Sequence, residues 1–155
     1  MIVEGAIAVK ACIQGEKRAV YKVYIDKAKR TKDFNYIRRL CANKNIIIEE
    51  LERSSFEEFN VGKTFGGIVA EVGERRSDEL GYGDAFYIDG IEDPFNIGYM
   101  LRTIYALGVS NVILKARDYS KLDAQIIKSS AGAYELLNIK YVDDEYAYLK
   151  SLKKD

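Results

Sequence analysis

The sequence predicts an α/β protein in which a small α/β domain is followed by an incomplete parallel α/β domain. Segments rich in β-branched and aromatic residues alternate with segments whose apolar residues recur at helical spacing. A polar, glycine-bearing stretch divides this alternation into two parts. Beyond it the order is strand, helix, strand, helix, strand, which favours parallel strands joined by right-handed crossovers. Since sheets usually hold more than three strands, we expect a second domain that is incomplete or completed by a partner.

The first domain is expected over residues 1–73. Apolar residues at helical spacing open it, and glycine ends the pattern at Gly15. A strand rich in valine and tyrosine follows, and Asp33 is a candidate helix cap. The expected elements are a helix over 3–13, a strand over 19–25, a helix from Asp33 to Cys41, a strand over 46–48, a short polar helix over 49–59 and a strand over 66–72.

Residues 74–84 are expected to form a linker, because this stretch is polar and has no apolar period. The second domain is expected over residues 85–155. Its expected elements are strands over 85–89, 111–115 and 138–142, and helices over 93–107, 122–131 and 143–153.

Composition excludes several kinds of site. Lys and Arg total 24, as do Asp and Glu, so nucleic-acid binding would have to come from a local basic patch. Histidine is absent and Cys12 and Cys41 are the only cysteines, which excludes a tetrahedral zinc site and a histidine-dependent triad within one chain; no metal is expected. A disulfide between the two cysteines remains an alternative to the favoured interpretation, two free buried thiols in a reducing cytosol.

Membrane insertion is not expected, because no stretch approaches the roughly 20 apolar residues of a membrane span. The acidic start of the chain also lacks the basic region of a signal peptide. We therefore expect a soluble, cytoplasmic protein with no membrane partner.

The segment from Asp93 to Arg102 carries the most information about function. Asp93 is a good helix N-cap, and Pro94 suits the first helical position. Gly98 needs another explanation, because glycine inside a helix costs about 1 kcal/mol relative to alanine. A close approach of another backbone segment to Gly98 would explain why glycine stands there. Asn96 and Arg102 lie about 120° apart around such a helix, so they are expected to flank one groove.

Two motifs in this chain resemble those of the SpoU/TrmH family of RNA 2'-O-methyltransferases. The first is Asp93-Pro-x-Asn96-x-Gly98-x-x-x-Arg102-Thr103, followed by Ala106-x-Gly108, and the second is Ser129-Ser-Ala-Gly-Ala-Tyr-Glu135. Gly5-x-x-x-Val9 and the strand at 66–70 resemble the family's amino-terminal substrate-binding domain. The resemblance covers nearly the whole chain, and two motifs in order are more specific than either alone.

The resemblance implies an α/β-knot (SPOUT) fold and transfer of a methyl group from S-adenosylmethionine to a ribose 2'-hydroxyl of tRNA or rRNA. Arg102 matches the family's catalytic arginine. Because arginine is essentially never deprotonated in a protein, we expect it to orient the RNA phosphate and hydroxyl and not to act as a general base. Asn96 and Glu135 match further catalytic motif positions and are expected to support Arg102 by hydrogen bonds.

The family also implies a homodimer with its active site at the subunit interface. On that basis an apolar surface made of Leu101, Ile104, Tyr105 and Leu107 is expected to be shared between subunits or with a missing strand.

RNA contacts are expected at two places. One is the basic loop after the first strand, which carries Lys27, Lys29, Arg30 and Lys32. The other is Ser129 and Ser130. Each has a structural alternative: the loop would be a solvated turn, and the serines would bond back to the preceding helical turn. For Glu135 the alternative is a carboxylate satisfied by Lys128 or by backbone.

The family's third motif, a glycine-rich segment around the cofactor, has no counterpart after Tyr141. Residues 143–155 contain no glycine, so the tight backbone approach that a cofactor pocket needs is not expected there. Cofactor-binding residues therefore remain unknown, and we expect a truncated or diverged chain that is inactive alone. The alternatives are an enzyme, a non-catalytic RNA-binding module and a generic nucleotide-binding domain. The last is disfavoured because no Gly-x-Gly-x-x-Gly turn or phosphate loop follows a strand.

Overall fold

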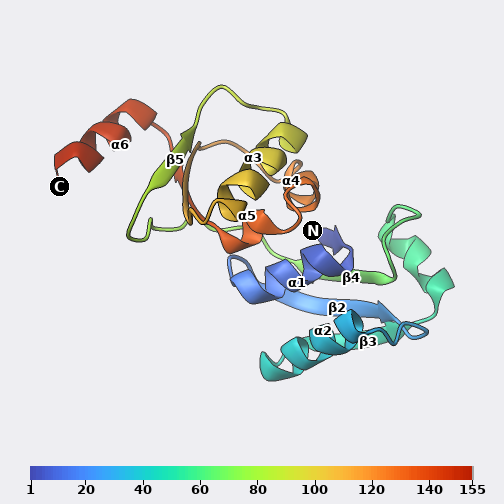
Figure 1. Cartoon of the computed structure of the whole chain (residues 1–155). Helices are drawn as coiled ribbons and strands as arrows, with labels where there is room; N and C mark the ends of the chain where they lie inside the picture. The colour runs from blue at the N-terminus through green and yellow to red at the C-terminus, as the bar shows by residue number, and fades with distance from the viewer. Residues whose placement is uncertain (155) are drawn as a thin grey trace. The chain divides into compact units, whose positions relative to one another are not determined.

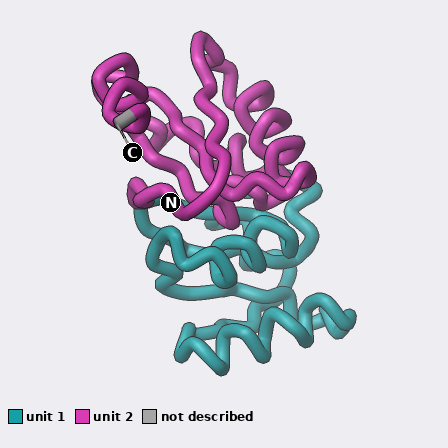
Figure 2. The backbone as a smooth tube through the Cα atoms, turned by 60° about the vertical axis from the view of Figure 1, so that its left-hand side comes forward, with its two compact units in different colours: residues 1–75 teal, residues 76–155 magenta. Residues whose placement is uncertain are grey.

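The structure is a computed structural model that describes residues 1–154, with side chains described for residues 1–153. The chain divides into two compact units, Met1–Arg75 and a second that begins at Arg76 (Figure 2). The boundary falls within the segment 74–84 that was expected as a linker. Residue 155, the end of the expected second domain, lies outside the described residues.

The first unit contains a mixed four-stranded sheet with the order β1-β4-β2-β3 (Figure 1). Its strands are β1 (Ile2–Glu4), β2 (Val20–Asp26), β3 (Ile47–Leu51) and β4 (Ile68–Val72). β4 runs antiparallel to both β1 and β2, and β3 runs parallel to β2.

Helices α1 (Ala6–Gly15) and α2 (Lys32–Asn43) pack against each other and against the sheet. Val23 and Ile25 of β2 are fully buried. Tyr24 lies between them in the strand and therefore points to the opposite face. There it packs with Phe56 of the 3-10 helix η1 (Arg53–Phe59) and with Val69.

Three predictions in this unit were wrong in detail. The expected helix over 3–13 begins only at Ala6, because Ile2–Glu4 pairs with β4. Asp33 lies in the first turn of α2, whose N-cap is Thr31. Glu49 and Glu50, expected in a helix, continue strand β3 because both pair with β2 and bond to cations. Tertiary pairing thus outweighs the helix propensity of glutamate here.

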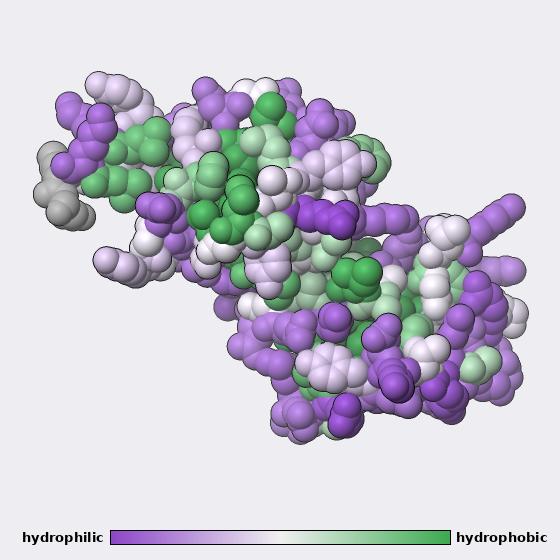
Figure 3. Space-filling model, in the orientation of Figure 1, coloured by the Kyte–Doolittle hydropathy of each residue, from purple (hydrophilic) through white to green (hydrophobic). Residues whose placement is uncertain are grey.

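The second unit contains three strands, β5 (Ala85–Ile88), β6 (Asn111–Lys115) and β7 (Asn138–Val142). All are parallel, as the sequence predicted, and they lie in the order β5-β6-β7. The helices are α3 (Pro94–Ala106), α4 (Asp123–Ser129), α5 (Ala133–Leu136) and α6 (Glu145–Ser151), followed by the 3-10 helix η2 (Leu152–Lys154). Helices α3, α4 and α5 contact one another. In Figure 3, hydrophobic side chains of this unit reach the visible face among hydrophilic ones.

The expected helix over 122–131 ends earlier, at Ser129, and a short helix that was not predicted follows it. Ala131 and Gly132 have φ values of 50° and 84°, and left-handed backbone at two successive residues ends the right-handed helix. The chain can then turn into α5, which places Tyr134 and Glu135 inside the unit.

Residues just after Arg75 belong structurally to the second unit. The backbone N–H of Asp78 donates to the carbonyl of Ile139, and its carboxylate accepts the N–H of the same residue. Further along, the buried side chain of Asn111 bonds both the N–H and the carbonyl of Gly81. This segment therefore follows the open side of β7 and reaches the start of β6.

Cys12 and Cys41 are both buried and form no disulfide, which confirms the interpretation as free thiols. Burial raises the pKa of the Cys41 thiol to about 11. None of the helices that the structure describes has the length and apolar character that a bilayer crossing requires. Among residues 1–154 no group of acidic or cysteine side chains is arranged to hold a metal ion.

Candidate functional site

Helix α3 starts with the cap that the sequence predicted. The Asp93 carboxylate accepts the backbone N–H of Asn96 at 2.9 Å, and Pro94 occupies the first helical turn. These two residues satisfy or remove donors that would otherwise be unpaired at the helix start. The start of α3 is thereby defined at Pro94.

The close approach expected at Gly98 is confirmed, and its partner is the end of α4. A Cβ atom on Gly98 would stand 2.7 Å from Cβ of Ser129 and 2.9 Å from the backbone nitrogen of Ser130. The Ser129 hydroxyl also lies 3.2 Å from the carbonyl of Pro94. The first motif therefore packs directly on the second, and glycine is the residue that permits the contact.

Asn96 and Arg102 both lie on the exposed side of α3. Arg102 forms no hydrogen bond or ion pair with any other part of residues 1–154. Phe95 and Tyr99 precede it at intervals of seven and three residues, on the same side of the helix, and both are largely exposed. An unpaired cation thus stands beside an exposed aromatic ridge.

The apolar surface expected at α3 needs a correction. Leu101 and Ile104 are 0% and 4% exposed and belong to the core of their own unit. Only Tyr105 and Leu107, at 49% and 68%, are available to another chain. The helical period places the first pair inward and the second pair outward.

Glu135 does not join Arg102 at the surface. Its side chain is fully buried in α5, and no hydrogen bond within the described chain links Arg102 to Glu135 or to Asn96. Ser130 is also fully buried. Its hydroxyl donates to the carbonyl of Ile127 and accepts the N–H of Tyr134, so it is not available to a ligand at the surface in this structure.

Sequence patterns gave no sign of a buried polar network beside these residues. The Tyr134 hydroxyl donates to the Asp123 carboxylate at 2.9 Å and lies 2.6 Å from the Tyr141 hydroxyl. These bonds join α4, α5 and β7. They hold the segment that carries Ser129 and Glu135.

The basic loop of the first unit is partly neutralised. Lys27 forms an ion pair with Glu52, and Arg30 bonds both oxygens of Glu50 at 2.9 and 3.3 Å. Arg38 bonds the same carboxylate. Hydrogen bonds from the two guanidinium groups lower the pKa of Glu50 to about 2.

The other two loop cations, Lys29 and Lys32, have no carboxylate partner within residues 1–154. The stem of Lys29 lies beside Gly67, and Lys32 starts α2 at the surface. The loop is thus an array of charges of both signs with two unpaired lysines.

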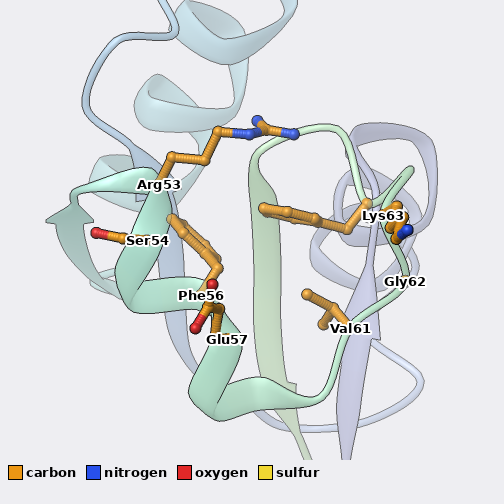
Figure 4. A pocket seen from close by; sticks show the side chains of 8 residues that line it. Arg53, Ser54, Phe56, Glu57, Val61, Gly62 and Lys63 are labelled. Atoms are coloured by element: carbon orange, nitrogen blue, oxygen red, sulfur yellow. The ribbon is translucent and has the colours of Figure 1, made fainter.

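A cavity in the first unit was not predicted from the sequence. It has a volume of about 330 Å³ and lies between η1 and the segment 61–65 (Figure 4). Phe56 and Phe65 form part of its wall, and Arg53 and Lys63 supply cations. No spacing pattern joins these residues, because pairing of β2, β3 and β4 brings their segments together.

The fold and the packed motifs define the class of protein: an α/β protein of two units, the second of which joins two motifs that resemble those of the SpoU/TrmH family. A family model described as "SpoU rRNA Methylase family" matches residues 85–155. A second, "RNA 2'-O ribose methyltransferase substrate binding", matches residues 2–77. The two matches follow in order and cover almost all of the sequence. This chain therefore belongs to the SpoU family of RNA methylases.

Relatives support this assignment. The 23S rRNA (guanosine-2'-O-)-methyltransferase RlmB of Pseudomonas aeruginosa is 28% identical over 163 aligned positions, which cover 98% of this chain and 65% of the relative. The mitochondrial rRNA methyltransferase 1 of Saccharomyces cerevisiae is 47% identical over 57 residues, 37% of this chain and 14% of the relative. The chain thus spans less than two thirds of the length of these relatives.

Solved structures share the fold. A crystal structure of an RNA 2'-O ribose methyltransferase superposes with a TM-score of 0.72 at 19% identity, and covers 99% of this chain and 59% of that chain. The SpoU methyltransferase AviRb of Streptomyces viridochromogenes, solved with AdoMet, gives a TM-score of 0.68 at 19% identity with the same coverage.

The described residues do not fit a complete site for S-adenosylmethionine. After β7 the chain forms α6, which has no buried residue, and residues 143–154 contain no glycine that would let backbone approach a ligand closely.

Proposed function

We propose that this chain takes part in methylation of ribose 2'-hydroxyl groups in tRNA or rRNA, with S-adenosylmethionine as donor. The observation that carries the proposal is Arg102. It is exposed and unpaired on a capped helix that is held against the second motif by the Gly98–Ser129 contact. An arginine in that state is available for a phosphate or a hydroxyl group of bound RNA.

In this proposal Arg102 positions the RNA and does not remove its proton, because a guanidinium stays protonated at any physiological pH. Holding the ribose oxygen in line with the methyl group would supply much of the acceleration, about 7 kcal/mol or more in well-oriented systems. Asn96 stands on the exposed side of the same helix and would hydrogen-bond the same nucleotide.

The first unit would bind the RNA backbone. Lys29 and Lys32 have no carboxylate partner in the described chain, so they would bind RNA phosphates directly. Lys27 and Arg30 would first have to break their ion pairs with Glu52 and Glu50. Ser129, half-buried at the end of α4, remains a candidate for RNA contact. Glu135 is proposed to act from inside the fold, by supporting the turn that carries the second motif.

The proposal includes a homodimer. The exposed apolar residues Phe95, Tyr99 and Tyr105 of α3, with Leu107 just after the helix, support it, because a monomer rarely exposes such a row without a partner. Light scattering at high protein concentration tests this part, and a strict monomer would contradict it. A cytoplasmic location goes with the proposal, since two free thiols suit a reducing compartment.

The first test is calorimetric titration of S-adenosylmethionine into the folded chain, followed by a tritiated methyl-transfer assay on total tRNA and rRNA. If the donor binds and methyl is transferred, Arg102→Ala should lower kcat strongly, with Lys121→Ala as the control for loss of an exposed cation. Equal activity of wild type and Arg102→Ala would contradict the role of Arg102.

A second candidate function is a non-catalytic RNA-binding module. Helix α6 has no buried residue, and the segment after β7 contains no glycine. Both features favour this candidate, because the described chain then offers no close backbone contact for S-adenosylmethionine. This candidate predicts RNA affinity that falls with salt, and no calorimetric signal with S-adenosylmethionine. Measurable donor binding would exclude it.

A further inference from the structure

The cavity beside η1 contains a cation held in a fixed place. The guanidinium carbon of Arg53 lies over the ring of Phe65, 5.0 Å from its centroid. One guanidinium nitrogen is also 3.4 Å from the carboxylate of Asp26. In Figure 4 the Arg53 side chain extends from η1 above the other labelled side chains. Two independent contacts thus restrain a side chain that is otherwise flexible.

Asp26 is itself well anchored. Its side chain is only 5% exposed, and its other oxygen accepts the backbone N–H of Ala28 at 2.9 Å. Arg53 in contrast keeps 55% of its side chain exposed. The ring of Phe65 covers one side of the guanidinium. The rest of this charged group is accessible to a ligand at the cavity.

Two ionised side chains flank this surface. Lys63 lines the cavity and has no carboxylate partner within residues 1–154. Glu57 lines it as well and is exposed. A lysine binds phosphate, and a carboxylate accepts hydrogen bonds from the amino group of a base. The volume of about 330 Å³ is at the lower end of small-molecule sites and has room for a base.

We infer that this cavity receives one unstacked nucleobase of an RNA strand, which stacks on the Arg53 guanidinium while the adjoining phosphate binds Lys63. The inference rests on the proposed function and names where its RNA is read. Stacking on arginine planes is a common way to hold bases of single-stranded RNA. A base inside a duplex has both faces covered and does not enter.

The position of the basic loop agrees with this site. Lys29 donates its backbone N–H to the carbonyl of Asp26, the residue that also holds Arg53. Lys29, which has no carboxylate partner in the described chain, therefore lies close to the residue that holds Arg53, and in this inference it binds a phosphate of the strand that leaves the bound base.

The test uses the whole chain and a uridine 12-mer RNA with one central 2-aminopurine nucleotide. Binding is followed by anisotropy, and stacking of the central base by its fluorescence. Arg53→Lys keeps the charge and removes the planar surface. It should weaken binding of the single strand about tenfold, at the lower end of the range for loss of one stacked base, and abolish the fluorescence change. The slope of affinity against salt should stay unchanged.

Three comparisons separate this inference from the proposed function. Arg39→Lys, an exposed arginine on α2, should leave binding unchanged. Lys63→Gln should reduce the salt slope by about one. The same RNA annealed to its complement should bind wild type and Arg53→Lys equally. If wild type binds the single strand but Arg53→Lys matches it in affinity and fluorescence, the nucleobase site is overturned while RNA binding stands. If wild type binds neither RNA, the RNA-binding role and the site are both overturned.

Discussion

Gly98 of α3 and Ser129 of α4 touch so closely that no side chain fits between them. A Cβ on Gly98 would lie 2.7 Å from Cβ of Ser129 and 2.9 Å from the next backbone nitrogen, distances that real Cβ atoms essentially never show. The contact joins the two sequence motifs of the second unit. It also explains why a helix otherwise suited to alanine carries glycine here.

Gly98→Ala should destabilise the second unit by about 1–3 kcal/mol, because an added methyl overpacks a backbone contact that cannot move easily. Urea unfolding followed by circular dichroism measures the change. Gly62→Ala is the matched control, since a Cβ there meets only the Glu4 side chain at ordinary distance. Equal stability of Gly98→Ala and wild type would show that α3 and α4 can separate freely.

Asp93→Ala should cost about 1 kcal/mol of stability, because the N–H of Asn96 loses its acceptor at the start of α3. Asp93→Ser should recover most of this loss, since serine is also a good N-cap. Thermal melting of the three proteins checks the order. Recovery with serine separates the loss of a cap from the loss of a negative charge.

The lowered pKa of the Glu50 carboxyl group predicts that the stability of the folded protein depends on pH. Its pKa falls from about 4.5 in an unfolded chain to about 2 beside Arg30 and Arg38, so its contribution is present at neutral pH and is lost as pH falls between these values. Glu50→Gln should therefore lower the urea midpoint at neutral pH and approach wild type only near pH 2. Glu58→Gln removes an exposed carboxylate that has no cation partner in the described chain. Its urea midpoint should differ less from that of wild type at both pH values.

The two thiols should react slowly with Ellman's reagent in the native protein. Cys12 and Cys41 are fully buried, and the pKa of about 11 at Cys41 keeps the unreactive thiol form at neutral pH. Two equivalents should react rapidly in guanidinium chloride. Fast labelling without denaturant would mean that α1 and α2 open on that timescale.

The fold was predictable where periodicity and tertiary structure agree. The strands Asn111–Lys115 and Asn138–Val142 were predicted with their observed bounds, because short β-rich runs stand between clear turn signals. Glu49 and Glu50 were misassigned because nothing local shows that pairing with β2 and ion pairs, with Lys22 for Glu49 and with arginines for Glu50, will hold them in a strand. Helix α5 was missed because its start depends on a left-handed alanine, Ala131.

The candidate site was predictable only as far as its residues lie close together in sequence. The cap at Asp93 and the glycine at Gly98 follow from one helix and its neighbours. The burial of Glu135 depends on a turn that local propensity does not specify. Likewise, Arg53 meets Phe65 only after the sheet of the first unit has formed.

The hydrogen bonds between Asp78 and Ile139 decide where a recombinant fragment of the second unit should begin. Together with the Ser77 hydroxyl, which accepts the N–H of Tyr141, they occupy backbone groups along the open side of β7. A fragment that starts at the strand Ala85–Ile88 would leave those groups ready to pair with a strand of another molecule, and would aggregate. One that starts at Arg76 keeps its own protective edge, so recombinant versions of the second unit should begin there.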